Sequence, residues 1–159
     1  MRLLRKTLLV MMVLLLAGCS QRMKEFSHAG IVVSVPSSYN FREMDSKIEM
    51  FLYSEVKGLS VDVVGAQNKE ELAEHVEITT LEEFAQDLLY DYSFEDAFYD
   101  NGIYFMTAEV DLENGRMFEQ HAFLDDGNNF WWLVFVSAAR DRSLYEDEFR
   151  QWAGKVRFQ

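Results

Sequence analysis

The stretch Phe130-Trp131-Trp132-Leu133-Val134-Phe135-Val136 decides the fold of this chain. Successive side chains of a β-strand point to opposite faces of the sheet, so a strand formed here is apolar on both faces. A strand of this kind has to be buried from both sides. We therefore expect it to lie at the centre of a sheet, with further elements packed above and below it.

Two hairpin signals lead up to this stretch. The dipeptide Asn114-Gly115 separates residues 103–112 from residues 117–124, and Asp126-Gly127 leads from the latter into residues 130–138. Such dipeptides tolerate the positive φ angles that two-residue hairpin turns require. The sequence therefore predicts an antiparallel meander of three strands.

The remaining elements divide into strands before the meander and helices on either side of it. Alternating Ile31, Val33 and Val35 predict a strand that closes at Pro36, and residues 47–54 and 59–66 predict a hairpin turning at Lys57-Gly58. A short helix is expected over residues 69–75. The last residues, Val156 and Phe158, are expected to form a short closing strand.

Two longer helices are predicted by start signals and by helical spacing. Thr80-Leu81-Glu82-Glu83 is a capping box, and the apolar residues after it recur at helical spacing as far as Tyr92. Ser143-Leu144-Tyr145-Glu146 repeats the box before a stripe that ends in Trp152 and Ala153. The sequence thus predicts a single α+β domain over residues 28–159, an antiparallel sheet with helices packed on it.

The N-terminus carries a separate signal. Arg2, Arg5 and Lys6 precede an apolar run of about ten residues, too short to cross a bilayer as a helix, and the chain's only cysteine, Cys19, follows it. A lone cysteine cannot form an intramolecular disulfide, and this tail supplies no partners for a nucleophile or a metal ligand. We interpret residues 1–18 as a secretory signal peptide.

The residues Leu16-Ala17-Gly18-Cys19 resemble the lipobox of bacterial lipoproteins. The resemblance implies that Cys19 is acylated, for instance with palmitate, and becomes the first residue of the mature chain, with residues 19–27 as a lipid-anchored tether. Two or three acyl chains anchor a protein stably. Because Ser20 stands where the family's inner-membrane retention signal would place Asp, the resemblance implies an extracytoplasmic protein of the cell envelope, at the outer membrane if two membranes are present.

Charge limits the partners of the mature chain. The whole chain has 15 basic and 27 acidic residues, and loss of the three basic residues before Cys19 leaves 12 against 27, a net charge of −15. Nucleic acid requires a basic surface, so we expect no nucleic-acid partner. A protein partner with a basic surface is expected instead, besides the membrane that the acyl chains enter. Arg22 and Lys24 lie close enough to the anchor to touch lipid headgroups.

The order of elements in the mature chain resembles a second family. A strand ending in Val35-Pro36 with Tyr39 after it, a hairpin, a central helix, a three-stranded meander and a C-terminal helix are similar to the PsbP-like fold. That fold is shared by PsbP extrinsic proteins of photosystem II, a nuclear-import factor that binds the Ran GTPase, and DcrB-type lipoproteins. The resemblance implies an αβα sandwich and a non-enzymatic binding or assembly function.

One pair of residues is a candidate site within the meander. The predicted turns place Glu119 and His121 on the same face as Ala108, Val110, Trp132 and Val134. A carboxylate and an imidazole among apolar neighbours are typical of functional sites. We nevertheless favour a purely structural polar pair, because the sequence shows no nucleophile and no third orienting group. We treat Glu119, His121 and Trp132 as candidate binding residues.

Other chemistry finds little support in the sequence. The three histidines show no zinc-ligand spacing, and we expect no metal and no cofactor. The acidic residues 91–100 and the turn 125–128 lack the ligand order of a calcium loop. Three functions remain: a non-enzymatic binding or assembly module, which we favour; a small hydrolase or metal-dependent enzyme centred on Glu119 and His121; and a carrier of an apolar ligand. A solvent-open pocket lined by Trp131 or Trp132 would favour the carrier.

Overall fold

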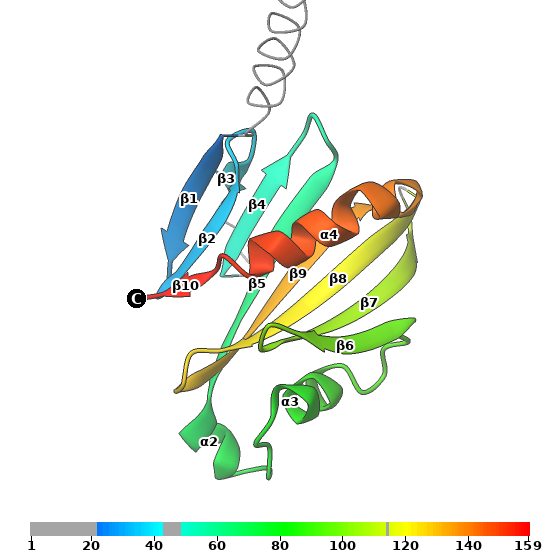
Figure 1. Cartoon of the computed structure of the whole chain (residues 1–159). Helices are drawn as coiled ribbons and strands as arrows, with labels where there is room; N and C mark the ends of the chain where they lie inside the picture. The colour runs from blue at the N-terminus through cyan, green and yellow to red at the C-terminus, as the bar shows by residue number, and fades with distance from the viewer. Residues whose placement is uncertain (1–21, 43–48, 114) are drawn as a thin grey trace, which may run out of the picture.

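The computed structural model describes residues 22–42, 49–113 and 115–159 (Figure 1). Cys19 and its lipobox lie outside these residues, as do Asn114 and the first two residues of the predicted strand at 47–54. Within the described ranges the chain forms two antiparallel sheets, one of seven strands and one of three. No helix in the described part of the chain is long and apolar enough to span a membrane.

The large sheet contains the predicted meander. Its strand order is β3-β4-β5-β9-β8-β7-β6, so β9 (Asn129–Ala138) is the middle strand. The other strands are β3 (Asn40–Arg42), β4 (Met50–Ser54), β5 (Leu59–Asn68), β6 (Asp96–Asp100), β7 (Ile103–Leu112) and β8 (Gly115–Asp125). The prediction that the strand beginning near Phe130 is central is confirmed.

The small sheet joins strands from both ends of the described part of the chain. It consists of β1 (Met23–His28), β2 (Ile31–Pro36) and β10 (Arg157–Phe158), with β2 in the middle. We predicted residues 19–27 as a tether, and this was wrong for residues 23–27. They pair with β2 along the whole of β1, from Met23 opposite Pro36 to His28 opposite Ile31, and Phe26 packs against the core.

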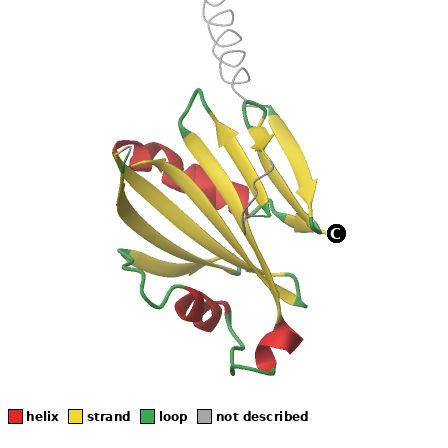
Figure 2. Ribbon diagram, turned by 180° about the vertical axis from the view of Figure 1, so that it is seen from behind, coloured by secondary structure: helices red, strands yellow, loops and turns green. Residues whose placement is uncertain are grey.

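The two faces of the large sheet are covered differently. Helix α4 (Arg142–Ala153) and the small sheet share one face, and α3 (Leu81–Leu88) lies on the other, as Figures 1 and 2 show. The short helix α2 (Lys69–Ala73) extends from the end of β5. Antiparallel sheets with helices on them are therefore present, but the expected αβα sandwich is only partly realised, because the three-stranded sheet covers part of one face in place of a helix.

Both faces of β9 bury apolar side chains, as its sequence requires. Trp131, Leu133 and Phe135 enter the core beneath α4 and the small sheet, where Phe149 stacks on Phe135 with ring centroids 5.4 Å apart. On the opposite face Phe130 stacks on Phe84 of α3 at 5.1 Å. The helix on each face is thus positioned by alternate residues of one strand.

The turns of the meander differ from their predicted form. Asp125 pairs with Phe130, which puts Gly127 and Asn128 at the centre of the turn in place of Asp126-Gly127. At the other hairpin Leu112 pairs with Gly115. Each difference moves the register by two residues. A shift of two leaves every side chain on its original face, because side chains alternate with a period of two.

Helix α3 confirms its predicted start. Thr80 accepts a hydrogen bond from the backbone N–H of Glu83, and the Glu83 carboxylate accepts one from the Thr80 N–H in return. These bonds, with others from Thr79, lower the pKa of Glu83 against the opposing effect of desolvation. The helix ends at Leu88 rather than at Tyr92: Leu89 makes the last helical hydrogen bond, to the Ala85 carbonyl, and the Tyr92 N–H donates to the Leu89 carbonyl in a turn.

Helix α4 does not use the predicted capping box at Ser143. A short 3₁₀ turn over Ala139–Asp141 leads directly into the helix, which begins at Arg142 and has no side-chain cap. Glu146 pairs instead with Arg142 one turn earlier, with a distance of 3.1 Å between Nε and Oε2. The N-cap position of α4 is Asp141, two residues before Ser143, so Ser143 lies inside the helix and cannot cap it.

Three strands were missed, and all are short or at the rim of a sheet. They are β1, β3 and β6, with sequences MKEFSH, NFR and DAFYD. Each pairs on one side only and contains charged or polar residues, and none has a run of apolar alternation long enough to mark it.

The two capping motifs make a matched pair of substitutions. Thr80→Ala should lower the free energy of unfolding by about 1 kcal/mol, because it removes the acceptor for the Glu83 N–H. Ser143→Ala should change it by less than about 0.5 kcal/mol, since its side chain caps no helix. Urea denaturation followed by circular dichroism measures both. Equal losses in the two variants would show that Ser143 does cap α4.

Candidate functional site

The candidate residues of the meander form a continuous chain of hydrogen bonds. Trp132 Nε1 donates to His121 Nδ1 at 3.1 Å, and His121 Nε2 lies 3.2 Å from Glu119 Oε2. The same carboxylate oxygen accepts a bond from the Tyr92 hydroxyl at 2.5 Å. Three strand residues and one residue from the segment after α3 are therefore joined in the order Trp132, His121, Glu119, Tyr92.

These bonds define the tautomer of the histidine. An indole N–H can only donate, so His121 Nδ1 has to be the acceptor and carries no proton. The ring is therefore neutral, with its proton on Nε2 directed at Glu119. Both ring nitrogens are used inside the protein, which leaves neither free to take a proton from a substrate.

Aromatic rings enclose the imidazole. His121 is almost fully buried, stacked on Trp132 at 5.9 Å and met edge-on by Tyr92 and Phe94, each at 5.5 Å. Tyr92 and Phe94 belong to the segment that follows α3, and this segment places both rings against His121 on the sheet. This packing requires the helix to stop before Tyr92.

The titration of Glu119 and Tyr92 follows from their contact. Burial acts to raise the pKa of Glu119, but the hydrogen bonds from His121 and Tyr92 outweigh it, and the pKa lies below its usual value. Burial and the bond to the Glu119 carboxylate raise the pKa of Tyr92. Glu119 is thus an ionised acceptor and Tyr92 a neutral donor. These protonation states strengthen the hydrogen bond between the two side chains.

A second carboxyl group on this face is in the opposite situation. Asp62 of β5 is opposite Val134, which is in turn opposite His121, so all three side chains share one face. Burial raises the pKa of Asp62 to about 7, with a hydrogen bond from Ser60 lowering it and the charge of Glu119 raising it further. Its Oδ1 atom is buried and has no hydrogen-bond partner among the described residues.

Around Asp62 this face of the sheet is only partly covered. Phe51 and Tyr53 of β4 lie opposite Asp62 and Ser60, and their rings stack at 5.7 Å. Both rings are half-buried, as is Val136 of β9. We call Phe51, Tyr53, Ser60, Asp62 and Val136 the open face.

A hollow of about 420 Å³ lies between β5 and α3. The apolar side chains of Phe84, Leu88 and Trp132 line it, together with Glu49 and residues 64–67. It occurs where β5 is irregular, since the register with β9 shifts between Val63 and Gly65. Trp132 therefore borders a solvent-open pocket, whereas Trp131 is buried in the core beneath the small sheet.

The acidic turn at residues 125–128 uses its carboxylates internally. Asp126 accepts hydrogen bonds from the backbone of Asn128 and Asn129 and from Trp131 Nε1, and Asp125 pairs with Lys69 at 2.6 Å. Desolvation acts to raise the pKa of Asp126, but these hydrogen bonds outweigh it and lower the pKa to about 2. Within the described ranges no cluster of His, Cys, Asp and Glu is arranged to hold a metal ion.

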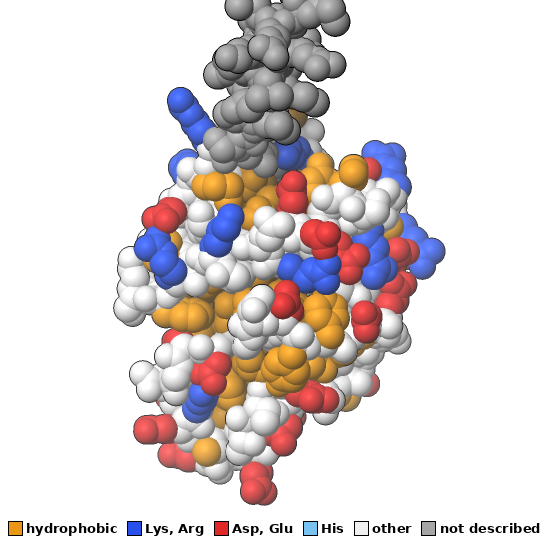
Figure 3. All heavy atoms as spheres, in the orientation of Figure 1, with side chains coloured by type: hydrophobic (Ala, Val, Ile, Leu, Met, Phe, Trp, Pro, Cys, Tyr) orange, Lys and Arg blue, Asp and Glu red, His pale blue; other side chains and the backbone are white. Residues whose placement is uncertain are grey.

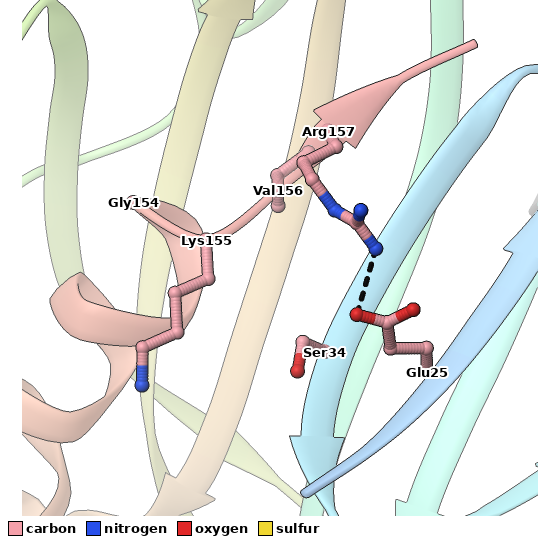
Figure 4. Close-up of a pocket in the computed structure, with 6 residues that line it drawn as sticks. All are labelled: Glu25, Ser34, Gly154, Lys155, Val156 and Arg157. Atoms are coloured by element: carbon pink, nitrogen blue, oxygen red, sulfur yellow. Dashed lines mark ion pairs between the residues drawn. The ribbon is translucent and has the colours of Figure 1, made fainter.

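A further hollow, of about 370 Å³, lies between β1, β2 and the segment after α4 (Figure 4). Arg157 and Glu25 form an ion pair across it at 2.7 Å, and the Lys155 side chain points away from them. Its charged groups pair with one another or diverge, so they do not converge on a ligand.

Sequence reasoning found three of the four residues in the hydrogen-bonded chain. It placed Glu119, His121 and Trp132 on one face, which the strand pairing shows, but it missed Tyr92 and Asp62. The helical spacing after Thr80 predicts Tyr92 to be part of a helix. Asp62 had a weak signal, a charged residue alternating with Val61 and Val63 in a strand next to the central one.

Comparisons with known proteins identify the fold. No family model matches the sequence, and no curated protein matches it. Among solved structures, the chain is similar to cyanobacterial PsbP (CyanoP) from Synechocystis sp. PCC 6803, with a TM-score of 0.64 and 8% sequence identity over 89% of this chain and 95% of that one. Identity this low shows shape alone and transfers no residue roles. The chain therefore has a PsbP-like fold.

Proposed function

We propose that this protein is a lipid-anchored lipoprotein of the cell envelope, held to its membrane by acyl chains on Cys19. In this proposal it acts as a non-enzymatic binding or assembly module. The lipobox at residues 16–19 supports the anchor. The PsbP-like fold is compatible with the binding function, since the family resemblance implies that function for most members.

The observation that carries the non-enzymatic part is the hydrogen-bonded chain of Trp132, His121, Glu119 and Tyr92. General acid–base catalysis requires a group within hydrogen-bond reach of the substrate and free to exchange a proton with it. His121 is buried and bonded at both ring nitrogens, and Glu119 accepts two bonds at one oxygen. In this proposal Glu119 and His121 support the sheet. A hydrolase that used them would first have to break their internal hydrogen bonds.

The open face supplies a surface for a partner. Half-buried aromatic rings next to Asp62, whose buried Oδ1 atom has no hydrogen-bond partner among the described residues, suit a basic side chain, which can stack on the rings and pair with the acid. The mature chain has a net charge of −15 by the count above, so its field attracts a basic partner.

Photocrosslinking tests this function in cells. We expect a crosslinking amino acid at Tyr53, on the open face, to give a discrete adduct with the full-length protein, and one at the exposed Leu144 on α4 to give none. Glu119→Gln should leave the adduct unchanged, because the amide oxygen still accepts from Tyr92 and His121. Cys19→Ser should abolish both fatty-acid labelling and the adduct.

Either of two results would contradict the proposal. Crosslinking at Tyr53 no stronger than at Leu144 would show that the open face binds no partner. Loss of complementation of a deletion strain by Glu119→Gln, with an unchanged melting temperature and adduct, would favour the enzyme centred on Glu119 and His121.

Asp62 gives a pH-dependent prediction. Its folded pKa of about 7 lies above the unfolded value of 3.8, so the folded chain binds more protons in this window and loses stability as pH rises from about 4 to 7. Asp62→Asn should therefore raise the free energy of unfolding by about 2 kcal/mol at pH 8, allowing for partial solvent screening. The gain should shrink towards pH 4. The same variant should give a weaker Tyr53 adduct, because the acid that pairs with the partner is gone. A more stable variant that still crosslinks fully would show that Asp62 does not contribute to binding.

The hollow beside Trp132 favours a second candidate function, the carrier of an apolar ligand. A pocket with apolar walls from Phe84, Leu88 and Trp132 suits a small apolar molecule. A carrier should bind a fluorescent fatty acid saturably. Leu88→Glu should reduce the affinity at least tenfold, because it places a charge in the apolar wall, and a loss of about 1.4 kcal/mol in binding free energy is already a factor of ten. Leu144→Glu serves as the control. Equal, unsaturable signals from both variants would exclude the carrier.

A further inference from the structure

Strand β1 begins close to the predicted anchor. Only residues 20–22 separate Cys19 from Met23, and four Cα–Cα steps at 3.3 to 3.6 Å span at most about 14 Å. The tether expected from the sequence ran to residue 27 and was about twice as long. If Cys19 is acylated, as the proposed function holds, the domain end that contains Met23 lies against the lipid headgroups.

The strand pairing shows which residues share that end. Met23 is opposite Pro36, and the Ser37 N–H donates to the carbonyl of Arg22 at 2.7 Å. Strand β3 then starts at Asn40 opposite Tyr53, which puts the β4–β5 turn, residues 55–58, at the same end. Figure 1 shows this turn at the same end of the molecule as the start of β1. We call Arg22, Met23, Lys24 and residues 55–58 the N-terminal pole.

The side chains of the N-terminal pole suit a membrane surface. Val56 is at the tip of the turn and is 92% exposed, and Met23 is 38% exposed. Arg22, Lys24 and Lys57 supply positive charge around them, with Glu25 and Glu55 opposing it. Apolar side chains flanked by basic ones are typical of segments that enter the headgroup region.

The opposite end of the domain carries the reverse charge. Residues 69–91, which include α2 and α3, contain eight acidic side chains and one lysine. In Figure 3 Asp and Glu predominate at this end, whereas Lys and Arg are most numerous towards the N-terminal pole. An anionic membrane repels the acidic α2–α3 end and attracts the N-terminal pole, so the charge distribution and the anchor favour the same orientation.

We propose that the N-terminal pole rests on the lipid surface that holds the anchor, with Val56 inserted among the headgroups. This inference deepens the proposed function and depends on its acylated Cys19. Contact at both Met23 and the β4–β5 turn orients the domain, because two separated contacts restrict the rotation that a single flexible tether permits. The α2–α3 end then faces away from the membrane.

A single labelled cysteine tests the orientation. Val56→Cys in the full-length protein, produced with its lipid, is labelled with an environment-sensitive fluorophore and placed in vesicles of phosphatidylethanolamine and phosphatidylglycerol. The control is Tyr90→Cys. The Tyr90 side chain is 81% exposed and follows α3 at the opposite end of the domain. We expect a blue shift and quenching by nitroxide-labelled lipids at position 56, and neither at position 90.

The outcomes separate the anchor from the orientation. Thioether acylation blocks the natural thiol, so a correctly processed variant takes up one label. One label with equal quenching at positions 56 and 90 would overturn the orientation and leave the anchor intact. Two labels per chain would show a free Cys19, which contradicts the anchor and this inference together. A shift at position 56 that persists in vesicles without phosphatidylglycerol would assign the contact to Val56 rather than to the basic residues.

Discussion

Strand β9 is apolar on both faces, and the rest of the architecture depends on covering both. The strand sits in the middle of seven, so its backbone is fully paired by β5 and β8. One face requires α4 and the small sheet, and the other requires α3. A chain with only one of these layers would expose Trp131 or Phe130 to water, at a cost of roughly 2 kcal/mol for each large side chain. The two-sided burial also explains why residues at both termini of the domain fold back to meet one strand.

The polar residues on the α3 face show how local partners decide the state of a buried acid. Glu119 and Asp62 are on the same face, separated by one strand, yet their pKa values move in opposite directions. Two donors surround Glu119 and keep it ionised, whereas Asp62 has one hydroxyl and a buried, unpartnered oxygen. A group that reduces stability at neutral pH on a half-open surface is a common feature of binding sites, where the partner supplies what the free protein lacks.

The sequence predicted the face of each meander residue better than the turns that join the strands. Both hairpins were displaced by an even number of residues, and an even displacement keeps Glu119, His121 and Trp132 on one side. The central position of β9 followed from its composition. The strands β1, β3 and β6 could not be recognised in this way, because each is a short rim strand that pairs on one side and mixes polar with apolar residues.

The contacts of Tyr92 and Asp62 depend on tertiary structure rather than on local pattern. The apolar spacing from Leu81 continues to Tyr92, so periodicity alone favours a longer helix. In the structure Tyr92 lies outside α3 and donates a hydrogen bond to Glu119, a residue 27 positions later in the chain. The environment of Asp62 likewise arises from neighbours on strands β4, β8 and β9, and no window of sequence around it contains them.

Strand β1 also determines how the domain responds to force. Its six residues are paired with β2 along their whole length, and the chain enters at Met23, beside the last residue of β2. A pull on the N-terminus along the strand axis loads this ladder in shear, so the hydrogen bonds resist together instead of opening one after another. The small sheet would be the first part to yield. Among the described residues the seven-stranded sheet shares no backbone ladder with it, so the open face would keep its shape after β1 had been drawn out.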